Sequence, residues 1–437
     1  MIPVPADPMG STMRDYSIRH AVAVFLFCAV AGATGLAVPS ARAADDKVSK
    51  AVGPVIVDAQ KALQANDFQG AMTQLKAAQA IADRKPFDDY IINRLMAAAA
   101  IGLKDMAAAA AAEEAAADSP AMPDADKKAV LHDAVQLAQV QKQWPKVIAY
   151  GQQLGALNGL DYLTASMLAV AFYETNDFPH AQQYAQQSID LAKAAGQPSD
   201  PNALQIVMGS QVKQNNQAGA EQTLEQIAVQ NNSPQTWGQL VGVAFGAKGM
   251  NDQVALYLYR LLVVAGAMDG NSYKEMGSLL SELGYPTEAA RVLEQGTSSG
   301  KISSAQVAAM LTKARHDAAI DERSLPQIAA SAEKSRTGEQ DVKLGEDYWG
   351  YGRYADAEAA ARRAVAKGGL KTPAEGTLLI GAAEVVQGKY ADAGQSLSQV
   401  AGNEAQTKTA HLWSLYAQAK QGPAPAPAAP AAPPPAH

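Results

Sequence analysis

A short motif recurs along the chain and constrains the fold more than any other feature of the sequence. In TNDFPHA, Phe178 is followed three residues later by Ala181, and turn-forming residues precede the aromatic side chain. The stretches NDFQGA, GRYADA and GKYADA repeat this order at Phe68, Tyr354 and Tyr390. A motif that returns at a regular distance predicts a repeated structural unit and not a single site.

The third residue after the aromatic position, which we call the anchor, measures the repeat length. Anchors 34 to 39 residues apart fall at Ala71, Ala109, Val147, Ala181, Ala220, Val254 and Ala289, and two more, 36 residues apart, fall at Ala357 and Ala393. The interval of 68 residues between Ala289 and Ala357 predicts one further, hidden unit around DERSLPQIAA.

This spacing indicates helical hairpins. Glycine or asparagine at the turn tolerates the left-handed conformation that ends a first helix. The aromatic residue then packs in the seam between the two helices, and the anchor lies where they cross. One hairpin cannot bury its apolar face alone, but stacked hairpins can. We therefore predict an all-α fold, an α-solenoid of about ten helix-turn-helix hairpins between Asp46 and Ala401.

The repeats resemble a known family. The stretch LGEDYWGYGRYADAEAAARRAVAKGG follows the order of the tetratricopeptide repeat (TPR), with matching residues at Leu344, Gly345, Tyr348, Gly352, Tyr354, Ala357, Ala361 and Ala364. DKVSKAVGPVIVDAQKALQANDFQGA near the start and AVAKGGLKTPAEGTLLIGAAEVVQGKYADA near the end are similar to an exported TPR-type family of proteobacteria. No chemistry is assigned to that family, so the resemblance implies a TPR-like fold and export but no mechanism.

The N-terminal residues have the features of a secretory signal peptide. Two arginines follow Met13, which is a better start than Met1, and an apolar run of about 18 residues comes next. PSARA ends the run with the small-residue pattern of a cleavage site before Ala44. We predict a signal peptide over 1–43 and a periplasmic or secreted protein of a Gram-negative bacterium. A membrane anchor is the alternative, and no integral span is expected after cleavage.

The cysteine count and the charge exclude several classes of site. Cys28 is the only cysteine and lies in the predicted signal peptide, so the mature chain has no disulfide, thiolate metal site or cysteine nucleophile. The chain has 36 Lys and Arg against 43 Asp and Glu. This acidic balance does not suit contact with phosphates, and we expect no nucleic-acid partner.

No motif predicts catalysis. None of the six histidines has a second histidine at metal-ligand spacing, and the nucleophile-elbow, phosphate-loop and zinc-protease motifs are absent from the sequence. His316-Asp317 and Glu113-Glu114 are adjacent helical residues whose side chains point apart, so solvated surface positions are predicted for both pairs. We expect no catalytic residue, no cofactor and no metal, and hence a non-enzymatic protein.

Two helical stretches have unusual compositions. Gly238, Gly242 and Gly246 lie four residues apart on one stripe, which predicts close packing against the next hairpin. VALYLYRLLVVAGAM is an apolar helix interrupted by Arg260, which predicts a buried second helix. A dimer seam is the alternative for this helix.

In this fold the first helices of the hairpins line a concave groove that holds an extended peptide or a partner helix. The repeat spacing assigns ten side chains to the groove, and their mixed charge and amide content suit hydrogen bonds to a backbone. They are Arg94, His132, Gln136, Tyr173, Glu174, Gln205, Gln239, Lys274, Glu346 and Trp349. The assignment depends on register, because a shift of one residue rotates a side chain by about 100°.

The repeat array is predicted over 44–420. A Pro/Ala-rich, polyproline-like disordered tail is predicted over 421–437, acting as a spacer or as a peptide recognised by a partner. We therefore expect a non-enzymatic periplasmic TPR-like scaffold that binds a protein or peptide partner in the cell envelope. The alternatives are a structural subunit of an envelope assembly or polysaccharide-export machine, and an enzyme acting on cell-wall material. Homo-oligomerisation stays open.

Overall fold

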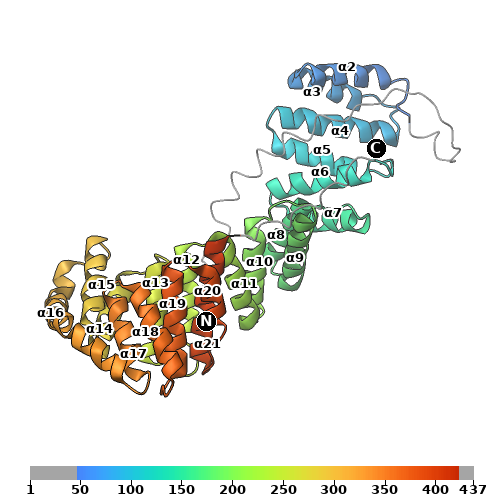
Figure 1. Ribbon diagram of the computed structural model, residues 1–437. Helices are drawn as coiled ribbons and strands as arrows, with labels where there is room; N and C mark the ends of the chain where they lie inside the picture. The colour runs from blue at the N-terminus through green and yellow to red at the C-terminus, as the bar shows by residue number, and fades with distance from the viewer. Residues whose placement is uncertain (1–46, 423–437) are drawn as a thin grey trace, which may run out of the picture. The chain divides into compact units, whose positions relative to one another are not determined.

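The computed structural model describes residues 47–422, and all regular structure within that range is α-helical. The predicted signal peptide and the segment after Gly422 lie outside the described residues. Twenty helices, α2 to α21, follow one another through short turns, most of them in antiparallel pairs (Figure 1). The predicted all-α repeat fold is confirmed.

The chain divides into two compact units at Ala220, inside α11. We call 47–220 the N-terminal unit and 221–422 the C-terminal unit. The helices as far as the boundary are α2 (Gly53–Gln64), α3 (Phe68–Gln79), α4 (Pro86–Gly102), α5 (Met106–Ala117), α6 (Lys127–Val140), α7 (Trp144–Ala156), α8 (Tyr162–Glu174), α9 (Phe178–Ala194), α10 (Pro201–Lys213) and α11 (Gln217–Asn231). Those after it are α12 (Pro234–Ala244), α13 (Asp252–Val264), α14 (Gly270–Leu283), α15 (Pro286–Ser298), α16 (Ser304–Lys334), α17 (Glu339–Gly350), α18 (Tyr354–Lys367), α19 (Pro373–Val386), α20 (Tyr390–Leu397) and α21 (Glu404–Gln421).

The turn inside each hairpin has the conformation that the motif predicts. Just before each second helix a residue adopts a left-handed backbone with φ between 54° and 86°, at Asn66, Lys104, Lys142, Asn176, Asn215, Gly249, Gly284, Gly352 and Gly388. Glycine and asparagine adopt this φ at low cost, whereas the two lysines are departures from the predicted residue types. In several hairpins an acid or amide then caps the second helix, as where Asp177 accepts the N–H of His180.

The anchors are where the motif places them. The side chains of all nine have no solvent exposure: Ala71, Ala109, Val147, Ala181, Ala220, Val254, Ala289, Ala357 and Ala393 are each 0 % exposed. Each lies in the first turn of its second helix. A small residue there lets two helices approach closely, so TNDFPHA is an architectural joint.

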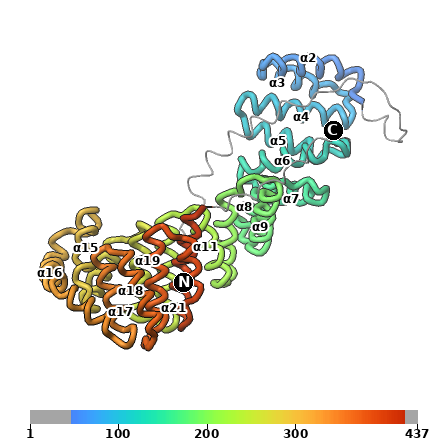
Figure 2. Tube along the Cα trace, in the orientation of Figure 1, coloured from blue at the N-terminus to red at the C-terminus, as the bar shows by residue number. Residues whose placement is uncertain are grey.

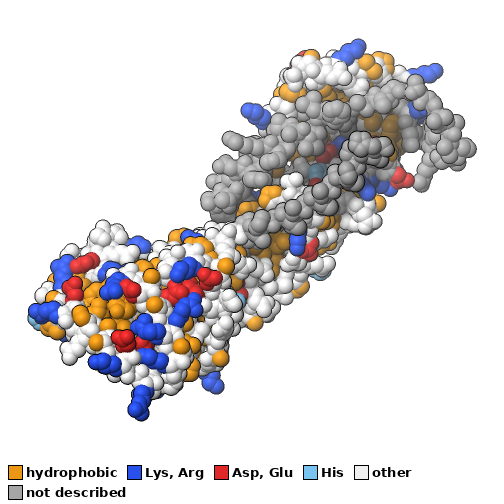
Figure 3. Space-filling model, in the orientation of Figure 1, with side chains coloured by type: hydrophobic (Ala, Val, Ile, Leu, Met, Phe, Trp, Pro, Cys, Tyr) orange, Lys and Arg blue, Asp and Glu red, His pale blue; other side chains and the backbone are white. Residues whose placement is uncertain are grey.

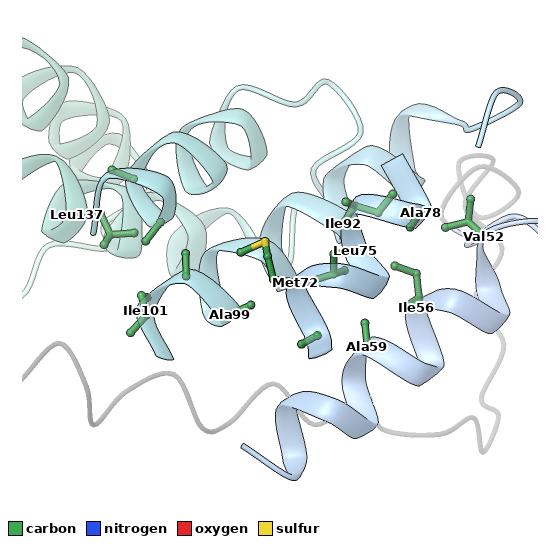
Figure 4. Packing of buried hydrophobic residues seen from close by; sticks show 14 residues of the cluster. Val52, Ile56, Ala59, Met72, Leu75, Ala78, Ile92, Ala99, Ile101 and Leu137 are labelled. Carbon is green, nitrogen blue, oxygen red and sulfur yellow. The ribbon is translucent and has the colours of Figure 1, made fainter. Parts of the chain in front are cut away.

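The N-terminal unit is an open stack in which each hairpin packs on its neighbours along the chain (Figure 2). Figure 4 shows Ile56 and Ala59 of α2, Met72 and Leu75 of α3, and Ile92 of α4 meeting in one apolar cluster. First helices also contact the next first helix, as α2 does α4 and α6 does α8. Contacts of this kind between successive first helices are expected in a solenoid.

The C-terminal unit closes on itself, which the sequence did not predict. Its last helix, α21, packs against α12 and α13, the first complete hairpin of the unit. The indole N–H of Trp413 donates to the carbonyl of Tyr257 at 3.0 Å, and the hydroxyl of Tyr416 donates to the carbonyl of Val264 at 2.9 Å. The Tyr416 ring also packs edge-on against Trp237, with centroids 5.1 Å apart. The two ends of this array are thus joined.

A single helix, α16, replaces the hidden hairpin that the interval of 68 residues predicts. It runs for 31 residues and continues through Pro326. The physical reason is that 304–334 contains neither glycine nor asparagine, the residues that most readily form the left-handed turn. One consequence is that second helices before α16 contact first helices after it. The second helix α15 contacts the first helix α17, and the second helix α13 contacts the first helix α19. α17 and α19 also contact each other, as successive first helices do.

Replacing Ala357 by leucine tests the anchor role. We expect Ala357→Leu to lower the free energy of unfolding by about 1–3 kcal/mol, because the added atoms must enter a filled helix crossing. A Cβ atom at Gly345 of α17 would lie 3.2 Å from the carbonyl oxygen of Ala357, which shows how close this crossing is. The matched control is Ala359→Leu, an exposed position on the same helix, measured by chemical denaturation. Equal losses in both variants would contradict the anchor role.

Candidate functional site

Three of the ten predicted groove residues lie together in the N-terminal unit. Arg94 on α4 and His132 and Gln136 on α6 share one group of polar side chains with Glu113 of α5, Asp133 of α6 and Asp161, the N-cap of α8. We call these six residues the Arg94–His132 cluster. It spans three consecutive hairpins, and all its members except Glu113 come from first helices or their caps.

Arg94 joins two carboxylates. Its Nη1 donates to Oε1 of Glu113 and, at 3.0 Å, to Oδ2 of Asp133. The Arg94 side chain is largely buried, Asp133 more so and Glu113 completely. These bonds tie α4, α5 and α6 together and hold Asp133 beside His132.

His132 lies between two carboxylates. Its Nε2 lies 3.5 Å from Oδ2 of Asp161, and its Nδ1 lies 3.8 Å from Oδ1 of Asp133. Hydrogen bonds to Asp133 and Asp161 raise the pKa of His132 to about 9, against a smaller opposing effect of burial. Burial acts to raise the pKa of Asp161, but hydrogen bonds from His132 and Thr164 lower it to about 2. The His132 side chain is 24 % exposed and that of Asp161 is 48 % exposed, so both reach solvent.

Glu113 corrects a sequence prediction. It was expected on the solvated surface, but its side chain is 0 % exposed and its Oε2 is buried without a hydrogen-bond partner. Burial raises the pKa of Glu113 to about 7, although Arg94 acts in the opposite direction. The sequence did not indicate this burial, because Arg94, the partner of Glu113, lies on the preceding helix. The other adjacent pair agrees with the prediction, since His316 is exposed on α16 and Asp317 pairs with Lys313.

The other groove residues of this unit lie outside the cluster. Tyr173 is half-buried and packs edge-on against Phe178, with ring centroids 5.5 Å apart. Glu174 is exposed at the end of α8, and Gln205 is half-buried on α10. Part of the Tyr173 ring therefore packs in the seam between α8 and α9.

Two predicted groove residues of the C-terminal unit are buried, and their assignment to an open groove is wrong. Trp349 is 3 % exposed and Glu346 is 2 % exposed. Both lie on α17, which packs against α15 and α19 inside the closed unit. A first helix at this position faces the interior, because closure of the array fills the space that an open solenoid leaves as a groove.

Arg260 is the centre of that interior. Its guanidinium donates to both carboxylate oxygens of Glu288, at 3.0 and 2.6 Å, and at 2.6 Å to Glu346. Tyr257 donates to Glu346, and the indole N–H of Trp349 donates to Glu288 at 3.0 Å. The guanidinium carbon also lies 4.6 Å from the centroid of the Trp349 ring. The prediction that Arg260 lies in a buried second helix is confirmed.

Gln239 lines a groove on the surface of the C-terminal unit. The groove has a volume of about 670 Å³ and runs along α12, and we call it the α12 groove. Its lining residues are Pro234, Gln235, Gly238, Gln239, Gly242, Val243, Gly246, Leu262, Gly266, Ala267, Met268, Asp269, Ser272 and Lys301. Lys274, on α14, is half-buried and is not among them.

The glycine stripe of α12 is open, which corrects the prediction of close packing. A Cβ atom at Gly242 would meet nothing within 4 Å, and one at Gly238 would meet only the Cβ of Ala267, at 3.9 Å. The stripe therefore forms the floor of the α12 groove. Small residues at helical spacing permit a close approach, but the sequence alone does not tell whether a neighbour makes one.

Residues 47–422 contain no group of three His, Asp or Glu side chains placed to hold a metal ion. In the same range no helix combines the length and the apolar character needed to cross a membrane. On the face of the C-terminal unit visible in Figure 3, acidic and basic side chains are intermingled.

No family model and no curated protein matches the chain. Among solved structures, it is similar to the C-terminal part of a TPR repeat-containing protein from Cytophaga hutchinsonii, at 13% identity over 74% of this chain and 98% of that chain, with a TM-score of 0.31. It is also similar to the TPR domain of P58(IPK), at 12% identity over 85% of this chain and 98% of that one, with a TM-score of 0.22. A Naa15/Naa10 structure with HypK-THB bound matches at 10% identity over 81% of this chain and 64% of that chain, with a TM-score of 0.31. Matches at this level carry no inference about what this chain binds.

Glu113→Gln tests the buried carboxyl by its pH dependence. A pKa raised in the folded state means that the folded chain binds this proton more tightly than the unfolded chain. The stabilisation is complete below the ordinary pKa of 4.5 and is lost as pH rises through about 7. We expect the stability of Glu113→Gln relative to wild type to improve between pH 4.5 and pH 8, by on the order of 2 kcal/mol in urea denaturation.

Taking the difference between variant and wild type removes titration of other groups, including Asp347, whose pKa burial also raises to about 7. A difference that stays constant with pH would contradict the burial of an ionisable Glu113.

Proposed function

We propose that this chain is an exported, non-enzymatic repeat scaffold of the cell envelope that binds an extended polypeptide on the first-helix face of its N-terminal unit. The observation that carries the proposal is the Arg94–His132 cluster. In it the His132 cation, the Gln136 amide and the Asp161 carboxylate all remain partly exposed on neighbouring hairpins.

The chemistry of the exposed groups suits a polypeptide backbone. A backbone offers both N–H donors and C=O acceptors, and a site for it needs both kinds of partner. Asp161 accepts hydrogen bonds, protonated His132 donates them, and Gln136 does both. Because Asp133 and Asp161 already fix the His132 ring, little side-chain freedom is lost when a ligand binds.

The closed interior of the C-terminal unit makes the N-terminal unit the better place for such a site. In the C-terminal unit, the positions that would line a solenoid groove hold Glu346 and Trp349, which are committed to Arg260 and Glu288. In the N-terminal unit, Gln136 lies eleven residues before its anchor, as Glu346 does, and still reaches solvent. Location in the periplasm rests on the signal-peptide features ahead of Ala44 and on the resemblance to exported TPR-type proteins.

Site-specific crosslinking in cells tests the proposal. A photoreactive amino acid at Gln136 should capture a polypeptide partner, whereas the same group at Gln186, an exposed position on second helix α9, should not. His132→Ala should weaken binding of the captured partner by about 5- to 30-fold, the effect of a moderate interface contact. His180→Ala is the matched control, because His180 is exposed on α9 and pairs with Asp177 away from the cluster.

Capture that is equal at the two positions, or binding unaffected by His132→Ala, would contradict the site. The location is tested separately, by N-terminal sequencing of this protein from the same cells. A start at Ala44 is expected, and retention of Met13 would contradict export with cleavage while leaving the binding site untouched.

A further inference from the structure

Contacts between charged groups in the Arg94–His132 cluster run from a buried carboxyl group to solvent. We propose that the protonation state of Glu113 regulates this cluster: ionised Glu113 strengthens the attraction of Asp133 for His132, and protonated Glu113 weakens it. A ligand that bonds to His132 should therefore bind less tightly as the pH falls. Only this last step rests on the proposed function, because the coupling of Glu113 to His132 belongs to the unliganded chain.

A continuous series of contacts links Glu113 to His132. Nη1 of Arg94 donates to Oε1 of Glu113 and, at 3.0 Å, to Oδ2 of Asp133. The other carboxylate oxygen of Asp133, Oδ1, lies 3.8 Å from Nδ1 of His132. Acidic and basic groups thus alternate along the series, and Asp133 faces both cations.

Glu113 is the member of this series that water does not reach. Its side chain is 0 % exposed, and its Oε2 has no hydrogen-bond partner among the described residues. Its other oxygen accepts from a guanidinium that also serves Asp133. A buried carboxylate with so little compensation takes up a proton more readily than one in water. Burial accordingly raises the pKa of Glu113 to about 7, and Asp133 acts in the same direction, whereas Arg94 opposes both.

Two neighbouring helices bring further ionisable groups to this region. On α4, Tyr90 donates its hydroxyl to Asp126 at 2.8 Å, and burial raises the pKa of Tyr90, so its hydroxyl stays neutral around pH 7. On α7, Lys146 donates to Glu114, which follows Glu113 in the sequence. The guanidinium of Arg94 is therefore the cation that responds to the charge of Glu113.

The two ends of the series titrate far from neutral pH. Hydrogen bonds to Asp133 and Asp161 raise the pKa of His132 to about 9. Burial acts to raise the pKa of Asp161, but hydrogen bonds from His132 and Thr164 lower it to about 2. His132 and Asp161 therefore keep their charges around pH 7, where the charge of Glu113 changes.

Protonation of Glu113 changes the charge that Arg94 has to balance. While Glu113 is ionised, two carboxylates share the guanidinium, and Asp133 attracts His132 with the part of its charge that is not neutralised. Once Glu113 is neutral, Arg94 pairs with Asp133 alone, and the attraction of Asp133 for the His132 ring decreases. Asp161 then provides most of the hold on the ring. More side-chain freedom must be lost when a ligand binds, which weakens binding.

NMR of the unliganded chain tests the coupling directly. The ring shifts of His132 should change in two steps with pH, one near pH 7 from Glu113 and one near pH 9 from the ring itself. In Glu113→Gln the first step should be absent, because glutamine does not titrate. The second step should move to lower pH, since a carboxylate that favours the His132 cation has been removed. His180, exposed on α9 and paired with Asp177, should titrate identically in both proteins.

Wild-type His132 without a step near pH 7 would overturn the proposal, whether or not the variant folds. A step near pH 7 that persists in Glu113→Gln would also overturn it, because another group would then be its source.

Photocrosslinking connects the protonation of Glu113 to binding. With the photoreactive group at Gln136, the yield of crosslink in an envelope extract should be about 2- to 10-fold lower at about pH 6 than at about pH 8. Glu113→Gln resembles the protonated residue, so it should give the low yield at both pH values. Equal wild-type yields, or a yield that falls equally in both proteins, would overturn the regulation. Absence of any crosslink would instead contradict the proposed polypeptide site, and the titration of His132 would then decide the coupling alone.

Discussion

The buried guanidinium of Arg260 is the constraint on which the C-terminal unit depends. It comes from α13 and bonds to Glu288 on α15 and Glu346 on α17, so one side chain connects three helices. Removing charges from water costs several kcal/mol per ion, and the cost is offset only when every donor and acceptor is satisfied in good geometry. Tyr257 and Trp349 supply the remaining hydrogen bonds to the two carboxylates. The cluster therefore favours the closed arrangement of helices over any partly open one.

The N-terminal unit has no comparable centre among its described residues, and its polar cluster is built differently. The Arg94–His132 cluster lies along a row of first helices, and of its members Glu113 is completely buried and Asp161 is about half exposed. In an open stack each hairpin is stabilised by its neighbours, and the first-helix face stays available to a ligand. The same repeat thus yields a surface in one unit and a filled interior in the other.

Much of the fold was predictable from sequence because the hairpin is a local structure. The turn residue, the aromatic and the anchor lie within six positions of one another, and the start of each second helix followed from them. The closure of the C-terminal unit was not predictable, because the partners of Arg260 lie 28 and 86 residues away. No local pattern in one sequence indicates a contact between residues so far apart.

The candidate site was predictable only in part, for the same reason. The repeat spacing assigned Arg94, His132 and Gln136 to first helices, and the structure has them on α4 and α6, whereas Glu346 and Trp349 lie on a first helix that faces inward. The burial of Glu113 depends on its contact with the preceding helix, α4. The glycine stripe is open at Gly242 because no neighbouring helix packs over it. Both are properties of packing between helices, which a repeat motif does not encode.

Native-state hydrogen exchange tests most directly the claim that one unit is closed and the other open. If the Arg260 cluster holds the helices of the C-terminal unit together as one cooperative unit, their slowest amides should share one free energy of opening. This applies to α13, α15, α17, α19 and α21. The slowest amides of α2 to α9 should instead show free energies that increase stepwise from α2, since an open array frays from its end. A stepwise gradient along α12 to α21, with α21 exchanging independently of α13, would contradict the closed unit.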